Sequence, residues 1–136
     1  MSFVIDASIA LSWCFADEAS PVADAALDRL ANEEALVPSI WPLEVANGLR
    51  TAERRGRLDL ADLPHVRELL VALPIRAEPI DLGTALGEVS ELARTLNLTA
   101  YDAAYLALAA RRGLALATAD EGLKRACVTA GVALVE

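Results

Sequence analysis

Short apolar runs alternate with helical patterns along the whole chain, and this alternation restricts the fold more than any other feature. The clearest helical pattern covers Leu82–Leu96, where apolar residues recur at i, i+3, i+4 and i+7 and the pattern ends before Asn97. Strands that alternate with helices need crossover connections, so we predict an α/β fold in three layers. Its centre is a mainly parallel sheet of about four or five strands, flanked by helices. The expected strands are Phe3–Ile5, Ala35–Val37, Ile75–Ile80, Leu114–Ala117 and Val132–Val135.

The length of 136 residues predicts one domain over residues 1–136. Hydrophobic residues make up 55% of the chain, yet the longest stretches without a charged side chain, Ala7–Ala16 and Ala126–Val135, have only ten residues. A bilayer span needs about 20 residues, so we expect no membrane segment. Met1–Asp6 has no basic region and soon reaches an acid, which argues against a secretory signal and for a cytoplasmic protein.

The chain has one histidine, His65, and two widely separated cysteines, Cys14 and Cys127. A single imidazole excludes two-histidine ribonucleases and most zinc hydrolases, and only His65 could serve in a catalytic triad. The cysteines form no C-x-x-C pair. We expect a surface role for His65 and a buried packing role for the cysteines. No glycine-rich phosphate-binding loop is present. Any catalysis therefore has to come from other side chains.

Acidic side chains are abundant, because 20 Asp and Glu residues accompany only 12 Lys and Arg residues, for a net charge of −8. A protein that holds nucleic acid by bulk positive charge has the opposite balance. Any role on nucleic acid must therefore depend on local positive charge or on a bound metal ion.

Acidic residues follow three of the predicted strands, at Asp6, at Asp81 and in the segment Thr118–Asp120. In parallel α/β sheets, ligands bind beyond the carboxyl ends of the strands, so these positions are candidates for a functional site. Aspartate and threonine are also common helix caps, because they accept hydrogen bonds from the free N–H groups of the first turn. Taken singly, each position is more simply interpreted as a cap.

Glu44 lies on a predicted helix that begins near Pro42, at the edge of a buried stripe formed by Trp41, Val45, Gly48, Leu49 and Ala52. Asn47 lies one turn further along. The same polar side continues with a basic row, which consists of Arg50, Arg54 and Arg57. Glu44 could therefore belong to a site, or it could reach for water or for one of these arginines.

Asp102 is the only charged residue in Ala100–Ala110, a segment that is apolar nearly all round and therefore predicts a buried helix. Thr99 and Asp102 have the spacing of a capping box, which would keep the carboxylate near the positive end of the helix. A carboxylate on a helix that is buried all round costs several kcal/mol unless more than a cap satisfies it. A bound cation would supply that compensation.

Four carboxylates from different parts of the chain could share one cleft, namely those of Asp6, Glu44, Asp102 and Asp120. Such a group repels itself strongly unless a divalent cation binds within it. Oxygen ligands alone select hard ions, so Mg²⁺ is the expected cofactor, with Mn²⁺ as its substitute. This ion can activate water and polarise a phosphodiester without any histidine. The four acids therefore predict a metal-dependent phosphodiester hydrolase.

A family pattern is present in four segments, taken in order: Val4–Trp13, Pro42–Asn47, Leu98–Ala109 and Leu116–Leu123. Together they resemble the PIN-domain ribonucleases, and among these the VapC-type toxins of prokaryotic toxin–antitoxin pairs. The resemblance implies a PIN-like domain with an acidic catalytic site formed by Asp6, Glu44, Asp102 and Asp120. It implies that Asp6 and Asp102 are the main Mg²⁺ ligands, with support from Thr118, Ser8 and Asn47. Asp81 matches no motif of the family, and we interpret it as a helix cap. Glu121 could supplement the site or complete a capping box with Thr118, and we prefer the capping box.

The resemblance further implies an endoribonuclease that cuts RNA internally and a VapB-type antitoxin as its partner. The arginines that could contact either one are Arg50, Arg54, Arg55 and Arg57. The resemblance also implies a homodimer. We expect Leu82–Leu96 and Leu98–Ala110 to form the interface, with small residues that allow close approach, namely Ala100, Ala103, Ala104, Ala107 and Ala110. The alternative is a helix packed wholly within one chain.

Other proteins also place acids at the strand ends of parallel sheets. A phosphatase with an aspartyl nucleophile needs D-x-D after its first strand, but Asp6-Ala7-Ser8 lacks the second acid. A phospho-receiver domain needs a lysine after a late strand, whereas the only lysine, Lys124, falls in a helical pattern. Another metal-dependent phosphohydrolase, or a non-catalytic interaction module whose acids are all helix caps, stays as the alternative.

Overall fold

One parallel sheet lies at the centre of the computed structural model, which describes all of residues 1–136. Its strands are arranged in the order β3-β2-β1-β4. Every neighbouring pair is parallel, which confirms the predicted α/β class. The strands are β1 (Ser2–Ile5), β2 (Glu34–Pro38), β3 (Ile75–Glu78) and β4 (Leu116–Ala117).

Three of the predicted strands are shorter than expected. The strand predicted over Leu114–Ala117 forms only at Leu116–Ala117. β3 ends at Glu78, because Pro79 has no N–H with which to continue the ladder. The segment 132–135 forms a single parallel bridge, between Leu134 and Leu116, because β4 itself offers only two residues for pairing. The sheet therefore has four strands, which is within the predicted number.

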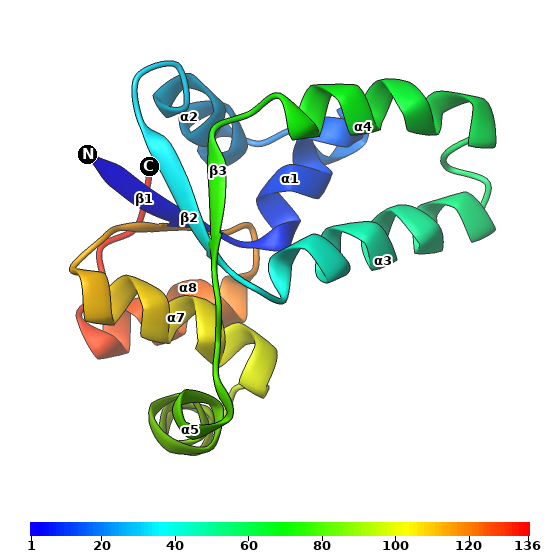
Figure 1. Ribbon diagram of the computed structural model, residues 1–136. Helices are drawn as coiled ribbons and strands as arrows, with labels where there is room; N and C mark the ends of the chain where they lie inside the picture. Colours follow the sequence, from blue (N-terminus) through cyan, green and yellow to red (C-terminus); the bar gives the residue numbers. More distant parts are fainter.

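Helices cover both faces of the sheet, as the three-layer prediction requires. In Figure 1, α2 lies above the strands, α1 lies to their right and α7 lies below them, while α3 and α4 form a hairpin that extends away from the sheet. None of the helices combines the length and the apolar character that a membrane crossing demands. Two short 3-10 turns, η1 (Ala16–Glu18) and η2 (Leu60–Asp62), join some of them. The helices are α1 (Ala7–Cys14), α2 (Pro21–Arg29), α3 (Trp41–Arg54), α4 (Leu63–Val71), α5 (Leu82–Thr84), α6 (Ser90–Leu96), α7 (Ala100–Arg112) and α8 (Glu121–Ala130).

The predicted helix Leu82–Leu96 is one continuous helical run with a wide turn inside it. α5 leads into the π-helical turn η3 (Ala85–Val89), which leads into α6. Ser90 Oγ donates to the carbonyl of Ala85, five residues earlier, at 2.7 Å. Asn97 ends the run in the left-handed conformation (φ 54°), which asparagine adopts more readily than most residues. The predicted end of the helix is therefore confirmed, whereas the wide turn was not predicted.

Helix α7 is buried within its own chain from Ala103 to Ala109. It packs on β1, β2 and β4 and also on η3 and α6. The alanines that we expected at a dimer interface instead allow close packing inside the chain, since Ala103, Ala104 and Ala107 cluster with Val89 of η3. The prediction that this helix offers an uncovered apolar face is therefore wrong, and packing within one chain is the correct alternative. The homodimer itself stays a prediction.

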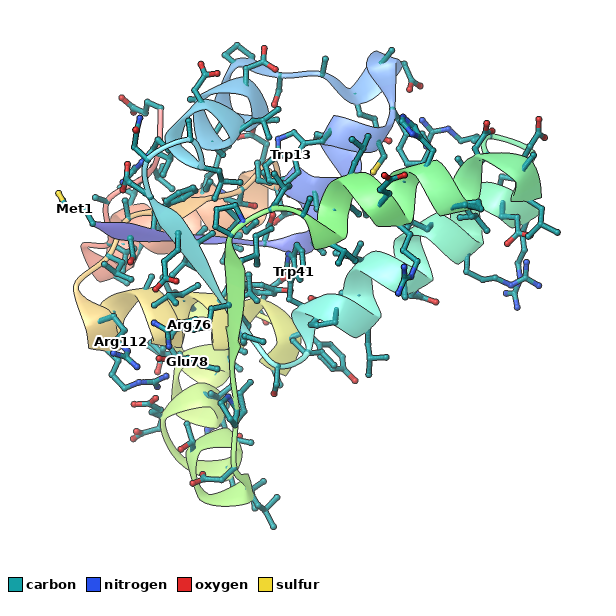
Figure 2. The ribbon with its side chains drawn as sticks, turned by 45° about the horizontal axis from the view of Figure 1, so that its top comes forward. Met1, Trp13, Trp41, Arg76, Glu78 and Arg112 are labelled. Carbon is teal, nitrogen blue, oxygen red and sulfur yellow. The ribbon has the colours of Figure 1, made fainter.

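Ion pairs anchor the carboxyl end of α7. Arg112 pairs with Glu78 at the end of β3, and Figure 2 shows the two side chains next to each other. Arg111 pairs with Glu88 of η3 and also approaches Glu78 at 3.6 Å. These contacts hold the end of the helix opposite to Asp102, so they help to fix the direction in which α7 crosses the sheet.

Candidate active site

The register of β1 and β4 brings Asp6 beside Thr118. Ile5 lies opposite Ala117, so the residues that follow them leave the sheet side by side. The Thr118 hydroxyl donates a hydrogen bond to the Asp6 carboxylate across 112 positions of sequence. Both side chains are buried, with 5% and 1% of their surface exposed. The carboxyl edge of the sheet thus brings together two segments that lie far apart in the sequence.

Asp6 is both a helix cap and a buried acid. Its carboxylate accepts a hydrogen bond from the Ile9 N–H at 3.2 Å, which caps α1, and another from Ser8 Oγ at 2.6 Å. Burial raises the pKa of Asp6 to about 6, although its hydrogen bonds oppose this rise. The negative charge of Asp102 adds to it. The capping role therefore does not compete with a role in the site.

Asp120 begins α8, where its carboxylate caps the helix by accepting a backbone N–H of the first turn at 2.7 Å. Two hydroxyls connect this loop to the buried acid. Thr118 Oγ1 accepts from the Asp120 N–H at 3.0 Å, and Ser8 Oγ accepts from the Ala119 N–H at 2.9 Å. Each hydroxyl also donates to Asp6. This geometry suits the supporting role that we predict for Ser8 and Thr118.

Asp102 lies in the first turn of α7 and is half-buried, not buried all round as its sequence surroundings predicted. Continuous burial begins only at Ala103. Thr99 caps the helix by accepting from the Asp102 N–H at 3.1 Å, but no protein donor reaches the Asp102 carboxylate, so the capping box is incomplete. Burial raises the pKa of Asp102, and the charges of Asp120 and Glu44 raise it further. The Asp102 carboxylate therefore interacts with other acids and accepts no hydrogen bond from the protein.

Glu44 lies half-buried in the first turn of α3 and pairs with a residue that the sequence analysis missed. Its Oε1 accepts a hydrogen bond from the Tyr105 hydroxyl at 2.5 Å. The alternative of an arginine partner is wrong, because Arg50 pairs with Glu53 at 3.1 Å. Tyr105 follows Asp102 by three residues on α7, and a helix places residues i and i+3 on one face. That spacing is the signal by which the sequence could have indicated Tyr105.

The other predicted contact residues are exposed on α3 or beyond it. Asn47 is exposed and makes no side-chain hydrogen bond. Helix α3 ends at Arg54, so Arg57 does not continue the predicted basic row. The Arg57 guanidinium instead stacks on Phe15 and pairs with Asp17 and Glu18. Arg54 and Arg55 are exposed and make no ion pair.

Structural roles were predicted for several residues outside this group. Asp81 caps α5, as predicted, by accepting a backbone N–H at 2.7 Å. His65 is exposed, and of the two free cysteines one is buried and the other only half-buried. Glu121 does not complete its predicted capping box with Thr118, because Asp120 is the residue that caps α8.

No three acidic, cysteine or histidine side chains are grouped closely enough to hold a metal ion between them. Mg²⁺ does not require such a cage, because it keeps several waters and is usually bound through one or two carboxylates together with substrate phosphate. Asp102 offers a carboxylate without a protein donor, and its charge acts on the Asp6 carboxylate. The oxygen donors of Asp6 and Asp102 therefore fit a hydrated hard cation.

The fold and the acidic group together define a class: parallel α/β proteins with carboxylates, and without histidine, at the edge where such sheets bind ligands. The family model of the PIN domain matches residues 3–128. The chain therefore belongs to the PIN-domain family, which confirms the resemblance of its four segments.

Curated relatives of this chain include VapC ribonuclease Mb0985 of Mycobacterium bovis and Ribonuclease VapC9 of Mycobacterium tuberculosis. Each is 35% identical to it over 118 residues, which is 86% of this chain and 84% of the relative. Among solved structures, PAE2754 from Pyrobaculum aerophilum matches with a TM-score of 0.68 and 26% identity. That match covers 93% of this chain and 84% of the other.

Proposed function

We propose that this chain is a Mg²⁺-dependent endoribonuclease, with Mn²⁺ as a substitute ion, and the toxin of a VapBC-type toxin–antitoxin pair. Its family and its relatives named VapC ribonucleases give the coarser activity, that of a nuclease acting on RNA. The proposal depends above all on the half-buried Asp102 carboxylate, which has no donor in the protein and interacts electrostatically with three other acids. A cation compensates such a group, and a helix cap does not.

Asp6 and Asp102 are the residues that would hold the ion, with Glu44 and Asp120 completing the acidic group. Hydrogen bonds from two hydroxyls and one backbone N–H orient the Asp6 carboxylate before any ligand arrives. When bound, Mg²⁺ lowers the pKa of a coordinated water and stabilises charge on the scissile phosphate. Without the ion, the acidic group repels the RNA backbone. We therefore expect RNA to bind productively only when the ion is present.

The exposed arginines at the end of α3 are candidates for contact with the RNA backbone or with an acidic antitoxin segment. Arg54 lies ten residues after Glu44, so the helix places it about 15 Å away along its axis. Arg54 and Arg55 are free of ion pairs, whereas Arg50 and Arg57 would first have to leave their carboxylate partners. We therefore expect Arg54 and Arg55 to contribute more than the other two.

Cleavage of assorted RNAs with Mg²⁺, and with a chelator as control, tests the activity. The informative variant is Asp102→Asn. Its matched control is Asp81→Asn, which changes an exposed capping aspartate that hydrogen-bonds only within its own turn. We expect cleavage by wild type and by Asp81→Asn, and none by Asp102→Asn or by chelated wild type. Full activity of Asp102→Asn would contradict the proposed site.

Thermal unfolding tests metal binding without any substrate. A ligand that binds only the native state stabilises it, so Mg²⁺ or Mn²⁺ should raise the melting temperature of wild type. The rise should disappear in the double variant Asp6→Asn/Asp102→Asn. An equal rise in both proteins would locate the ion somewhere else on the molecule.

A VapB-type antitoxin is the proposed protein partner, and the cytoplasm, where RNA is abundant, is the proposed place of action. Support comes from the relatives, which are named as VapC ribonucleases. The test is to isolate this chain from its host, to identify any small protein that co-purifies with it, and to assay the complex for RNA cleavage. We expect the complex to be inactive, and an active complex would argue against an antitoxin.

A further inference from the structure

The hydrogen bond between Tyr105 and Glu44 joins two helices that otherwise have little contact in the site. Helix α3 packs mainly on α1 and only slightly on α7. Within this weak contact, the Tyr105 hydroxyl donates to Glu44 Oε1 at 2.5 Å. Glu44 makes no ion pair, and its second carboxylate oxygen has no donor in the protein. This one bond therefore determines where the Glu44 carboxylate lies relative to Asp102.

Tyr105 is well suited to hold a carboxylate in place. Its side chain is only 1% exposed and belongs to the main hydrophobic core, so the ring cannot follow a moving partner. Burial, the bond to Glu44 and the surrounding acids all raise the pKa of Tyr105 far above its usual value. The hydroxyl therefore stays protonated, and able to donate, at neutral pH.

The donor is also neutral, which matters in an acidic site. An arginine or lysine in the same place would cancel the charge of Glu44 and compete with a cation for it. A hydroxyl orients one oxygen and leaves both the negative charge and the second oxygen available. Tyr105 and Asp102 stand three residues apart on α7, so a single helix face presents a candidate metal ligand and the group that orients its neighbour.

We propose that Tyr105 is a positioning residue for the reaction, which holds the Glu44 carboxylate in the acidic site through its hydroxyl. The inference rests on the proposed ribonuclease function. It adds a residue that lies within the segment Leu98–Ala109 but was given no role there and is not one of the four acids.

Tyr105→Phe removes the hydroxyl and keeps the ring, so the fold should survive. Partners that orient metal-site ligands typically account for 10–100-fold in affinity or activity. We expect kcat for RNA cleavage to fall by about tenfold or more and KM to change far less. The matched control is Tyr101→Phe, which removes an exposed tyrosine hydroxyl one turn earlier on the same helix and should leave cleavage unchanged. Equal kcat values for Tyr105→Phe and wild type would overturn the proposal.

A second measurement separates positioning from a merely structural role. Mn²⁺ affinity, followed by electron paramagnetic resonance, should weaken in Tyr105→Phe relative to wild type. In a Glu44→Ala background the same substitution should have no further effect, because its target is gone. An equal loss of Mn²⁺ affinity in both backgrounds would mean that Tyr105 does not act through Glu44.

Carbon-13 NMR of the Glu44 carboxyl group keeps this inference distinct from the proposed function, because it needs neither metal nor RNA. Glu44→Ala identifies the signal. At one fixed pH, Tyr105→Phe should move it toward the position of exposed glutamates, and Tyr101→Phe should not. If wild type neither binds Mn²⁺ nor cuts RNA, the proposed function fails, and the NMR result alone decides whether Tyr105 holds Glu44. If Tyr105→Phe does not move the signal, Tyr105 does not position the Glu44 carboxylate.

Discussion

Asp6 combines three tasks that proteins often divide between residues. It directly follows the central strand β1 and caps α1. It also accepts a hydrogen bond from the hydroxyl of Thr118, 112 residues later in the sequence. A substitution at Asp6 therefore changes stability and chemistry together. Asp102 has none of these structural duties, because its carboxylate has no protein donor. Among the four acids, Asp102 is the residue at which catalysis and stability can be separated.

The first prediction concerns Asp102→Asn. We expect Mg²⁺-dependent cleavage to fall by at least about 100-fold, because even groups that only orient metal ligands account for 10–100-fold. With a chelator present, the melting temperature should stay the same or rise, since one of several mutually repelling charges is removed. Differential scanning calorimetry and a cleavage assay check the two effects. A clear fall in melting temperature would identify Asp102 as a structural residue.

The second prediction concerns the pH dependence of stability without metal. The pKa of Asp6 is about 6 in the folded protein, against 3.8 for an ordinary aspartate. Between these values the native state keeps a proton that the unfolded chain has lost, so the free energy of unfolding should fall as pH rises from about 4 to about 6. This effect is worth about 3 kcal/mol and persists at higher pH.

Urea unfolding of metal-free protein at pH 5 and pH 7.5 measures the part of this effect above pH 5, which is about 1.4 kcal/mol. Asp6→Asn is the control, because a neutral amide cannot titrate while its oxygen can still cap α1. The unfolding free energy at pH 5 minus that at pH 7.5 should be larger in wild type than in the variant. The same pH dependence in both proteins would show that Asp6 is already ionised at pH 5.

The sequence identified the acids of the candidate site but not their surroundings. Asp6 and Asp120 could be predicted because they directly follow strands, where the geometry of a parallel sheet leaves little freedom. Tyr105 was missed, because a tyrosine inside an apolar helix resembles any other core residue, and only its spacing of three residues from Asp102 sets it apart. The burial of Asp102 was overestimated, because periodicity does not tell which end of a buried helix emerges into solvent.

At the scale of elements, the third prediction concerns the close packing of α7 against η3. Ala107 is buried against Val89, so Ala107→Leu should force the two helices apart and destabilise the protein by about 1–3 kcal/mol. Ala110→Leu, on the exposed side of the same helix, should change the unfolding free energy by far less. Chemical denaturation of both variants measures the difference. Equal effects would mean that α7 is not packed as tightly as its alanines suggest.

Element boundaries follow from the sequence wherever a residue has one clear role. Ser20 caps α2 by accepting from the Ala23 N–H at 3.2 Å, as its place before Pro21 indicates. The π-helical turn η3 has no such signal, because its residues fit the ordinary helical rhythm. The segment 132–135 has the composition of a strand but finds only two residues of β4 to pair with. Tertiary pairing, which a local sequence pattern does not contain, therefore limited this segment to a single bridge.

At the scale of the whole molecule, the layer order was predictable and the outlying hairpin was not. Alternating strands and helices leave few topologies other than a covered parallel sheet. Nothing in the apolar pattern indicates that α3 and α4 extend beyond the sheet, as Figure 1 shows. The single domain over residues 1–136 stays a prediction, and coincident unfolding transitions by different probes would test it.

The last prediction concerns self-association, whose surface has to be reassigned because α7 is covered by its own chain. Apolar surface remains in the carboxyl-terminal half at Leu82 and Leu86, which are 73% and 68% exposed on the α5–η3 run. Two such leucines, one turn apart, can seed an interface of the usual size, about 1,600 Å². We expect wild type to sediment at low micromolar concentration as a dimer of 14.4-kDa chains. Leu82→Ser/Leu86→Ser should sediment as a monomer, while Leu60→Ser, at an equally exposed leucine on η2, should remain dimeric. A monomeric wild type at every concentration would disprove the dimer, and a dimeric double variant would place its interface elsewhere.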